Sequence, residues 1–207
     1  MRIETRPSRI FVGLPPHGPQ QRIGLFGGTF NPPHEGHRRA SLLALRRLGL
    51  DRIWWMVTPG NPLKENGSVP SLTERMNSAA QVAAHPRIFV SGAEARFHTR
   101  YTADLIAILK ARAPAARFVW IMGSDGLVDF HRWENWQAIA ASVPVAVVNR
   151  PKTLLAPLSA RAARAFSRYR VDAEDARILA DLEPPAWLLL TGPRVRLSST
   201  ALRERAS

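Results

Sequence analysis

The sequence contains no cysteine in its 207 residues, which excludes disulfide bonds and any metal site built on thiolates. It also has no apolar run near the roughly 20 residues that a membrane-spanning helix needs. The first residues, MRIETRPSRIFVGLPPHGPQQR, lack the apolar stretch of a secretory signal. These absences predict a cytoplasmic protein without a membrane anchor.

Lysine is also scarce. Only Lys64, Lys110 and Lys152 are lysines among 29 basic residues, and the formal net charge is +13. The arginines are scattered and form no block of like charge, which is typical of an arginine-rich surface. A positive field would also favour a phosphate-rich small substrate. A basic nucleic-acid-binding protein is an alternative, but no recognition motif or basic stripe with interleaved aromatics supports it, so we expect no nucleic-acid partner.

From Arg22 onward, short apolar runs alternate with stretches of helical periodicity. The predicted strands are Ile23–Phe26, Ile53–Val57, Ile88–Val90, Phe118–Met122, Val145–Val148 and Trp187–Leu190. The predicted helices are Glu35–Leu48, Leu72–Ala83, Thr102–Ala111, Trp133–Ala141, Ser159–Tyr169 and Ser199–Arg205. This alternation indicates βαβ units. We predict an α/β fold with a Rossmann-like, doubly wound, mostly parallel sheet of about five to six strands and helices on both faces.

The domain organisation follows from the same pass along the chain. Residues 1–21 contain prolines and glycines without any period, and we expect a disordered N-terminal extension there. Residues 22–207 are long enough for one sizeable core and are expected to form a single domain. The sequence leaves the oligomeric state open.

The segment GGTFNPPHEGH, at Gly27–His37, directly follows the first predicted strand. Its two leading glycines let the backbone approach a ligand closely. His34 and His37 are three residues apart at the start of a helix, so both rings can face one side. Imidazole donors, open backbone N–H groups and the positive end of a helix dipole together make an anion pocket.

Two other interpretations of this segment compete with the anion pocket. A Gly/Pro turn with two capping or surface histidines is the simpler one. Zinc binding is the other, since histidines at this spacing can ligate the metal, but the spacing turns Glu35 away from the histidine face. Because a third ligand is not in place, we expect no metal held by the protein itself. No GxxxxGK[ST] loop is present, so a P-loop is also excluded.

A second segment of phosphate-binding residue types, LSSTALRER at Leu197–Arg205, follows the last predicted strand. Its serines and threonine could simply cap a helix, and a capped start still leaves N–H groups for an anion. Parallel sheets bind ligands beyond the carboxyl ends of their strands. The two segments therefore predict one phosphate site, assembled from the first and last turns of the sheet.

Both segments resemble signatures of one superfamily, the nucleotidyltransferase α/β-phosphodiesterases. GGTFNPPHEGH is similar to (G)GTF[DN]PxHxGH, and LSSTALRER is similar to ISSTxxR. The segments between them, VTPGNPLK, RYTAD, IMGSDGLVDFHRW and VAVVNRP, resemble the bacterial nicotinate-nucleotide adenylyltransferase family over Arg22–Arg205. The resemblance implies adenylyl transfer from ATP to nicotinate mononucleotide, with Mg²⁺ bound through the ATP phosphates. Another adenylyl- or cytidylyltransferase of the superfamily, such as the phosphopantetheine enzyme, is the alternative.

The resemblance also implies a role for individual residues. The residues matching the family's catalytic groups are His34, His37 and Arg203. Those matching its ATP-binding groups are Gly27, Gly28, Thr29, Phe30, Gly123, Asp125, Arg150, Ser199 and Thr200. Those matching its mononucleotide-binding groups are Lys64, Tyr101, Thr102 and Trp133, with Trp136 expected in the core. The chain departs from the family at Leu63, where a histidine is usual.

Overall fold

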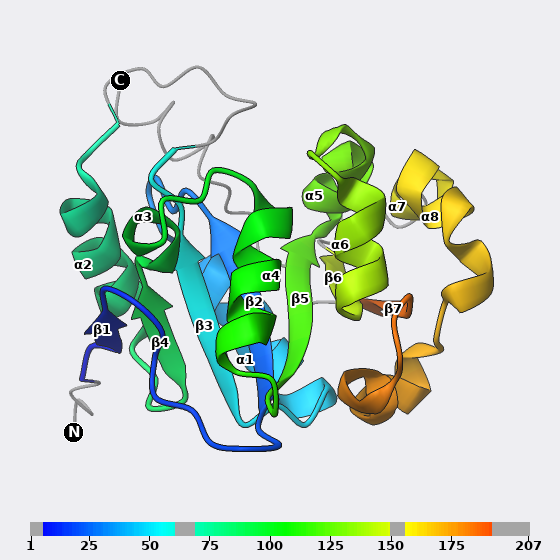
Figure 1. Cartoon of the computed structure of the whole chain (residues 1–207), viewed down its shortest axis with the longest axis horizontal. Coiled ribbons are helices and arrows are strands. Elements are labelled where there is room, and N and C mark those ends of the chain that lie inside the picture. Colours follow the sequence, from blue (N-terminus) through cyan, green and yellow to red (C-terminus); the bar gives the residue numbers. More distant parts are fainter. Residues whose placement is uncertain (1–5, 61–68, 150–155, 192–207) are drawn as a thin grey trace.

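The computed structural model describes residues 6–60, 69–149 and 156–191. Over these residues, seven strands form one parallel sheet in the order β1-β4-β3-β2-β5-β6-β7 (Figure 1). The strands are β1 (Arg9–Phe11), β2 (Arg22–Gly28), β3 (Arg52–Val57), β4 (Ile88–Ser91), β5 (Arg117–Gly123), β6 (Val145–Asn149) and β7 (Trp187–Thr191). Each pair of neighbouring strands runs parallel.

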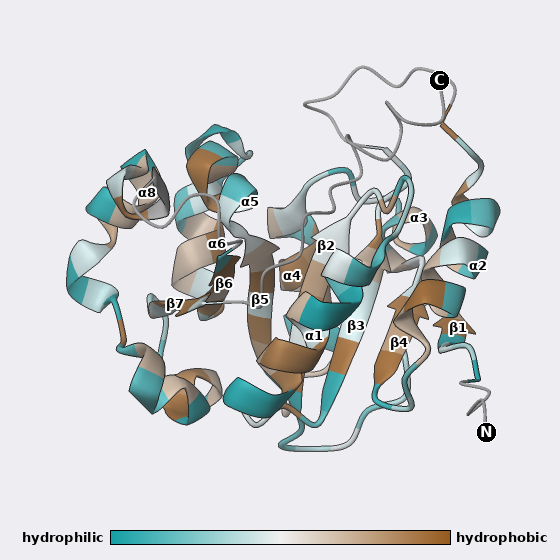
Figure 2. Ribbon diagram, turned by 180° about the vertical axis from the view of Figure 1, so that it is seen from behind, coloured by the Kyte–Doolittle hydropathy of each residue, from teal (hydrophilic) through white to brown (hydrophobic). Residues whose placement is uncertain are grey.

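Helices cover both faces of this sheet. The α-helices are α1 (Glu35–Arg47), α2 (Leu72–Ala83), α3 (Ala93–Arg96), α4 (Thr102–Arg112), α5 (Ser124–Asp129), α6 (Trp136–Ser142), α7 (Ala156–Ser159) and α8 (Arg161–Ala165). The 3₁₀ helices are η1 (Phe130–Arg132), η2 (Ser167–Tyr169) and η3 (Ala173–Asp181). In Figure 1, α4, α5 and α6 lie in front of the sheet, whereas the reverse view in Figure 2 brings α1 to the front. No helix in the described ranges is long and apolar enough to cross a bilayer.

The strand order fixes where a ligand can bind. Without the edge strand β1, the order is that of the Rossmann fold, with the two halves of the sheet meeting between β2 and β5. In such sheets the ligand crevice lies at the carboxyl ends of the two strands on either side of that switch point. Here those ends are Gly28 of β2 and Gly123 of β5. The predicted Rossmann-like fold is confirmed.

The core lies on both sides of the strands. In β3, Ile53 and Trp55 belong to the apolar cluster shared with α1 and α2, whereas Trp54 and Met56 belong to the cluster shared with α4. A strand that is buried on both faces needs apolar residues at successive positions. The sequence of β3, RIWWMV, meets this requirement after its first residue. In Figure 2, β4 and β5 are mostly hydrophobic, and helix α1 shows both hydrophilic and hydrophobic residues.

The six predicted strands are present, and one more strand was missed. Residues 6–21 depart from the disordered extension expected over 1–21, because Arg9–Phe11 pairs with β4 as the edge strand β1. Gly92 N–H donates to Phe11 O at 3.0 Å, and the Phe11 and Phe89 rings pack with centroids 5.2 Å apart. Three residues are too short a run to show a period of two, so only the partner strand reveals this one.

Two predicted helices have different boundaries. The helix expected over Trp133–Ala141 begins at Trp136, because Asn135 takes the left-handed conformation before it, and Asn is a preferred residue at such a position. The helix expected over Ser159–Tyr169 is broken, since Ala160 is extended between α7 and α8. The helix predicted over Ser199–Arg205 lies outside the described residues.

Candidate active site

The candidate site begins where β2 ends. Gly27 and Gly28 are its last two residues, as the first motif requires. A Cβ on Gly27 would come within 2.6 Å of the Trp120 ring, so this glycine is needed for packing against β5. The loop then passes through Phe30, which has a positive φ of 49°. The close contact of β2 with β5 therefore places this loop at the switch point.

Two histidines cap the helix that follows this loop. His34 is the N-cap of α1, and its Nδ1 accepts from Gly36 N–H at 3.1 Å. His37 Nδ1 accepts from His34 N–H at 3.2 Å, which completes a reciprocal capping box. The two ring centroids lie 3.8 Å apart. The spacing correctly predicted that both imidazoles share one side of the helix start.

These bonds assign the tautomer of both rings. A backbone N–H can only donate, so each Nδ1 must be the unprotonated nitrogen of a neutral imidazole. The proton of each neutral ring is then on Nε2. His34 and His37 thus each combine a capping acceptor with an Nε2–H donor, which is suited to an anion. The capping interpretation and the anion-binding interpretation are therefore compatible.

Aromatic packing fixes the orientation of His37. The Phe30 ring stacks on Trp55 with centroids 4.8 Å apart, and the His37 ring lies 5.0 Å from Phe30. Trp55 Nε1 donates to Ser41 Oγ at 2.8 Å, and Ser41 Oγ donates to His37 O at 3.0 Å. The Phe30 side chain is therefore part of the core, so any contact of Phe30 with phosphate is left to its backbone.

The second side of the crevice is the end of β5. Gly123 is the N-cap of α5, and Asp125 lies in the first turn of that helix with an exposed side chain. A Cβ on Gly123 would collide with the Asp125 carboxylate, so this glycine gives the carboxylate its room. Asp125 is thus placed at the switch point, as predicted from its position after a strand.

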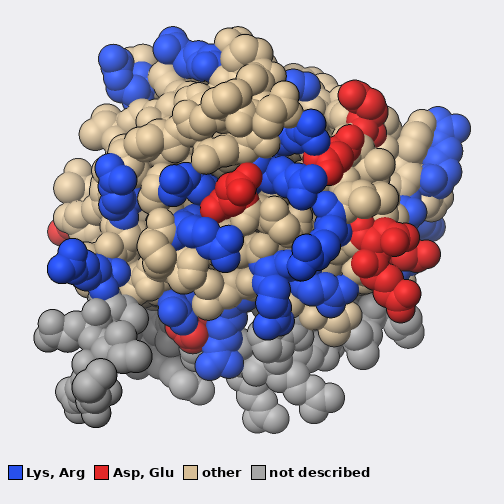
Figure 3. All heavy atoms as spheres, turned by 90° about the horizontal axis from the view of Figure 1, so that it is seen from below, with Lys and Arg blue, Asp and Glu red and all other residues tan. Residues whose placement is uncertain are grey.

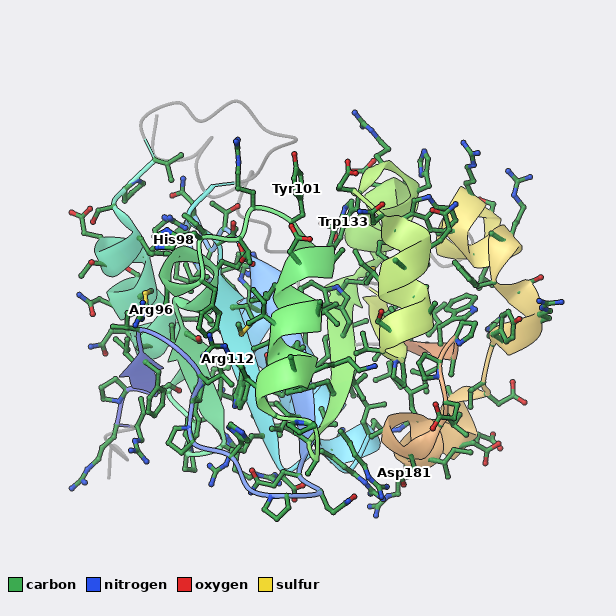
Figure 4. All side chains as sticks on the ribbon, viewed as in Figure 1. Arg96, His98, Tyr101, Arg112, Trp133 and Asp181 are labelled. Atoms are coloured by element: carbon green, nitrogen blue, oxygen red, sulfur yellow. The ribbon has the colours of Figure 1, made fainter. Side chains whose placement is uncertain are left out.

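The residues expected to bind the mononucleotide follow β4 and β5. Tyr101 is the N-cap of α4 and is 40% exposed, and Thr102 is the first residue of that helix. Trp133 follows η1 and is half-buried, with its ring edge-on to Trp120 and Phe130. In Figure 4, Tyr101 and Trp133 lie at the same end of the molecule, whereas Asp181 marks the opposite end.

Five predicted site residues lie outside the described residues: Lys64, Arg150, Ser199, Thr200 and Arg203. The described part of the site is therefore the edge formed by the ends of β2, β4 and β5. Its polar groups include imidazoles, backbone amides, hydroxyls and the exposed carboxylate of Asp125. Glu35, the nearest acid to the histidines, contacts Arg39 at 3.1 Å and Arg38 at 3.6 Å. Imidazoles and backbone amides are hydrogen-bond donors of the kind that suit an anion.

Comparison with known proteins agrees with this geometry. Residues 25–205 match the model of the cytidylyltransferase-like family. A protein of Bradyrhizobium sp. strain ORS 278, named probable nicotinate-nucleotide adenylyltransferase, is 59% identical over 88% of this chain and 95% of its own length. A protein of Brucella suis biovar 1 with the same name is 52% identical over 88% of this chain and 94% of its own. The chain belongs to the nicotinate-nucleotide adenylyltransferase branch of the cytidylyltransferase-like family.

A solved structure of this enzyme family has the same fold. The Plasmodium falciparum nicotinic acid mononucleotide adenylyltransferase complexed with APC has a TM-score of 0.63 and 16% identity. The match covers 89% of this chain and 83% of that one. A second structure of the Plasmodium enzyme, with NaAD bound, has a TM-score of 0.59. At this identity, both likenesses concern the fold alone.

Two buried titratable residues close to the candidate site, Arg75 and Glu94, were missed from the sequence. Arg75 of α2 is only 3% exposed, and burial lowers the pKa of its guanidinium because the charged form loses hydration. Glu94 of α3 is 7% exposed, and burial raises the pKa of its carboxyl to about 7, partly offset by a hydrogen bond with Thr58.

A signal for Arg75 was available in the sequence. Leu72, Met76, Ala79, Ala80 and Ala83 recur at helical spacing on the face of α2 that packs on the sheet. Arg75 falls within that apolar stripe, and a charge on such a stripe needs buried partners. Glu94 had no comparable signal, because α3 is a single turn without a readable period.

Proposed function

We propose that this protein transfers the adenylyl group of ATP to nicotinate mononucleotide, which yields deamido-NAD and pyrophosphate. The observation that carries the proposal is the placement of His34 and His37 at the switch point, where the capping box of α1 orients both imidazoles. Close relatives carry the name of this activity. Pyrophosphate release coupled to deamido-NAD formation tests it.

The reaction needs positioning more than covalent chemistry. An oxygen of the mononucleotide phosphate attacks the α-phosphorus of ATP, and the bond between that phosphorus and the bridging oxygen breaks. The electron pair of that bond leaves with pyrophosphate. Because negative charge grows on the leaving group, fixed donors that face it lower the barrier. His34 and His37 are the described donors in this role, and Arg203 is proposed as a third.

The remaining contacts follow the family pattern. The backbone of Gly27, Gly28, Thr29 and Phe30 is proposed to hold nucleotide phosphate, since an N–H beside a glycine admits a close oxygen. Asp125 would accept from a ribose hydroxyl. Tyr101, Thr102 and Trp133 would line the pyridine site, where a large aromatic face suits a flat ring.

Residues outside the described ranges complete the proposed site. Lys64, Ser199 and Thr200 are assigned to the reacting phosphates, and Arg150 is assigned to the adenine. Residues 22–207 would form one nucleotidyltransferase domain. The cytoplasm is its proposed compartment, because the reaction consumes ATP there.

Mg²⁺ is proposed to enter with ATP, bound by phosphate oxygens and water. Among the described residues, no group of three or more His, Asp or Glu is arranged to hold a metal. The donor set of imidazoles and amides fits the phosphates instead, and Mg²⁺ favours phosphate and water oxygens. The ion would neutralise part of the triphosphate charge.

The deciding assay offers ATP and Mg²⁺ with one acceptor at a time: nicotinate mononucleotide, nicotinamide mononucleotide or phosphopantetheine. We expect pyrophosphate release and a dinucleotide product with nicotinate mononucleotide. Turnover of phosphopantetheine alone would assign the chain to the alternative enzyme of the superfamily. His37→Ala serves as the control for a contaminating activity, because it should remain folded and lose roughly 10²-fold in kcat/KM.

A further inference from the structure

We propose that Arg75 is a positioning residue that holds the two loops after β2 and β3 in the orientation needed for phosphate binding. It contacts no substrate in this proposal. It acts on the backbone of the loops that do, and the inference therefore rests on the proposed adenylyl transfer.

The guanidinium of Arg75 is used almost completely by backbone carbonyls. Its Nη1 donates to Thr29 O at 2.8 Å and to Thr58 O at 2.7 Å. Its Nη2 donates to Pro59 O at 3.1 Å, and its Nε donates to Pro70 O at 3.0 Å. Four of the five guanidinium N–H groups thus have a partner. No ion pair of Arg75 with a carboxylate is found among the described residues, so carbonyl dipoles stabilise its charge.

These carbonyls belong to corresponding positions of adjacent strands. Gly28 of β2 pairs with Val57 of β3, and Thr29 and Thr58 are the residues that follow each of them. Thr58 N–H also donates to Gly28 O at 3.1 Å. Arg75 therefore links the two loops by hydrogen bonds at the point where each of them leaves the sheet. One bond from Arg75 to the loop after β2 and two to the loop after β3 set the distance between the two loops.

The direction of the carbonyls determines the direction of the amides. In a trans peptide, the N–H points opposite to the C=O of the same unit. The Thr29–Phe30 and Pro59–Gly60 peptides are trans, since the described cis bonds are elsewhere. With both carbonyls turned toward Arg75, the Phe30 and Gly60 N–H groups point away from it. Arg75 thereby presents backbone donors on the side opposite to the helix that carries it.

A buried acid extends the same arrangement toward the pyridine site. Thr58, whose carbonyl accepts from Arg75 and whose hydroxyl donates to Gly60 O, also lies beside Glu94 of α3 and lowers the pKa of its carboxyl. Glu94 O accepts from Thr99 N–H at 3.0 Å, close to Tyr101 at the start of α4. The Arg75–Thr58–Glu94 chain thus links the phosphate loop with the segment that leads to Tyr101.

The test compares Arg75→Met, which keeps the length of the side chain and removes its donors, with Arg75→Lys. Arg47→Met is the matched control, because Arg47 also donates to one carbonyl, Ala173 O, but joins α1 to η3 away from these loops. Hydrogen exchange is measured over residues 27–33 and 56–60. Steady-state kinetics with ATP and nicotinate mononucleotide are measured on the same folded samples.

We expect amide exchange in both segments to rise by roughly tenfold or more in Arg75→Met and to stay unchanged in Arg47→Met. We expect kcat to fall by roughly 10²-fold, because misplaced donors lose alignment, while the mononucleotide KM changes much less. Arg75→Lys should restore part of kcat, since an ammonium reaches some of the carbonyls.

Unchanged exchange in these segments, or a folded variant with kcat within about threefold of the wild type, overturns the proposal. If Arg75→Met does not fold, the exchange criterion alone is applied to Arg75→Lys, and unchanged exchange in that variant overturns the proposal. Exchange does not depend on turnover, so it separates this inference from the proposed function. A wild-type protein that makes no deamido-NAD refutes the function, while exchange still decides whether Arg75 orders the loops.

Discussion

At the scale of single residues, His34 and His37 each use their two ring nitrogens differently. Their Nδ1 atoms accept from the backbone at the start of α1, which leaves the Nε2–H as the donor. The sequence indicated both capping and anion binding but presented them as alternatives. The structure joins them, because the cap is what orients the donor. Removing the imidazole therefore changes helix stability as well as chemistry, and a variant that separates the two effects is informative.

His34→Asn is that variant. Asn is among the best N-cap residues, and its Oδ1 can replace Nδ1 as the acceptor for Gly36 N–H. We expect stability within about 0.5 kcal/mol of the wild type and a loss of roughly 10²-fold in kcat/KM. His34→Ala should lose the same activity and about 1 kcal/mol of stability in addition. Urea unfolding beside initial-rate kinetics checks both; an active His34→Asn enzyme contradicts the donor role.

Trp133 supports a second prediction at this scale. Both tryptophans of this segment are half-buried: Trp133 lies edge-on to Trp120 and Phe130, and Trp136 lies edge-on to Phe130 and Phe166. The family match assigns the ligand contact to Trp133. Trp133→Ala should raise the KM for nicotinate mononucleotide by roughly tenfold and the KM for ATP much less.

Trp136→Ala is the control for Trp133, and we expect it mainly to lower the unfolding temperature. If Trp133→Ala instead costs about 3–5 kcal/mol of stability and leaves the ratio of the two KM values unchanged, Trp133 is a core residue.

At the scale of elements, the sequence predicted what depends on periodicity. The strand at Ile53–Val57 and the helix at Leu72–Ala83 have the predicted bounds within one residue. In both, the apolar residues that the element buries form a pattern long enough to be recognised in the sequence. The elements that were missed are short. A strand of three residues and a helix of four, β1 and α3, depend on tertiary partners that no local pattern reveals.

Glu94 of the missed helix α3 should make the stability of the protein depend on pH. Glu94 is buried with its pKa raised to about 7, above the ordinary value of 4.5. Between these two pH values the folded protein keeps a proton that the unfolded chain releases, so stability falls as the pH rises through this window. Above pH 7 the folded protein carries the full cost of a buried carboxylate, up to about 3 kcal/mol.

Glu94→Gln removes that cost. We expect the variant to match the wild type in stability near pH 5 and to exceed it at pH 8. Denaturant unfolding at both pH values measures the difference. Asp104→Asn, which removes an exposed acid of helix α4, is the control for the loss of a carboxylate. A stability difference that is the same at both pH values contradicts the buried-acid interpretation.

At the scale of the whole molecule, a group of described arginines lies at the end opposite to the candidate site. Arg22, Arg52 and Arg117 are the first residues of β2, β3 and β5, and Arg87 directly precedes β4. Figure 3 views this end and shows Lys and Arg side chains concentrated on it. Many of these side chains bind the protein itself, as Arg87 does with Leu50 O. Composition predicted a basic surface but could not place it, because charge has no period in the sequence.

At this end of the molecule, Asp181 forms ion pairs with two of the arginines. It forms an ion pair with Arg22 at 2.5 Å and another with Arg117. These two ion pairs link η3 to the starts of β2 and β5. Burial alone would raise the pKa of Asp181, but Arg117 and Arg22 outweigh it and hold that pKa below its ordinary value. The stabilisation is therefore present at neutral pH and is lost as the pH falls through the lowered pKa.

We expect Asp181→Asn to lower the free energy of unfolding by roughly 1 kcal/mol or less at low salt, because the pair is partly exposed. The difference should shrink in high salt and in acid. Turnover should stay within about twofold of the wild type, since the change is at the amino ends of the strands. Thermal melts at two ionic strengths, beside the pyrophosphate assay, check this; a large loss of kcat would mean that the two ends of the sheet are coupled.

The edge strand β1 has a consequence for how the protein is made. Arg9–Phe11 leaves the ribosome before its partner β4, which is synthesised only after β2, α1, β3 and α2. The β1 segment therefore remains unpaired while the first βαβ unit forms. A bulky fusion placed directly before residue 6 would remain next to an edge that closes late. We expect such a fusion to slow the maturation of the chain more than it disturbs the finished enzyme.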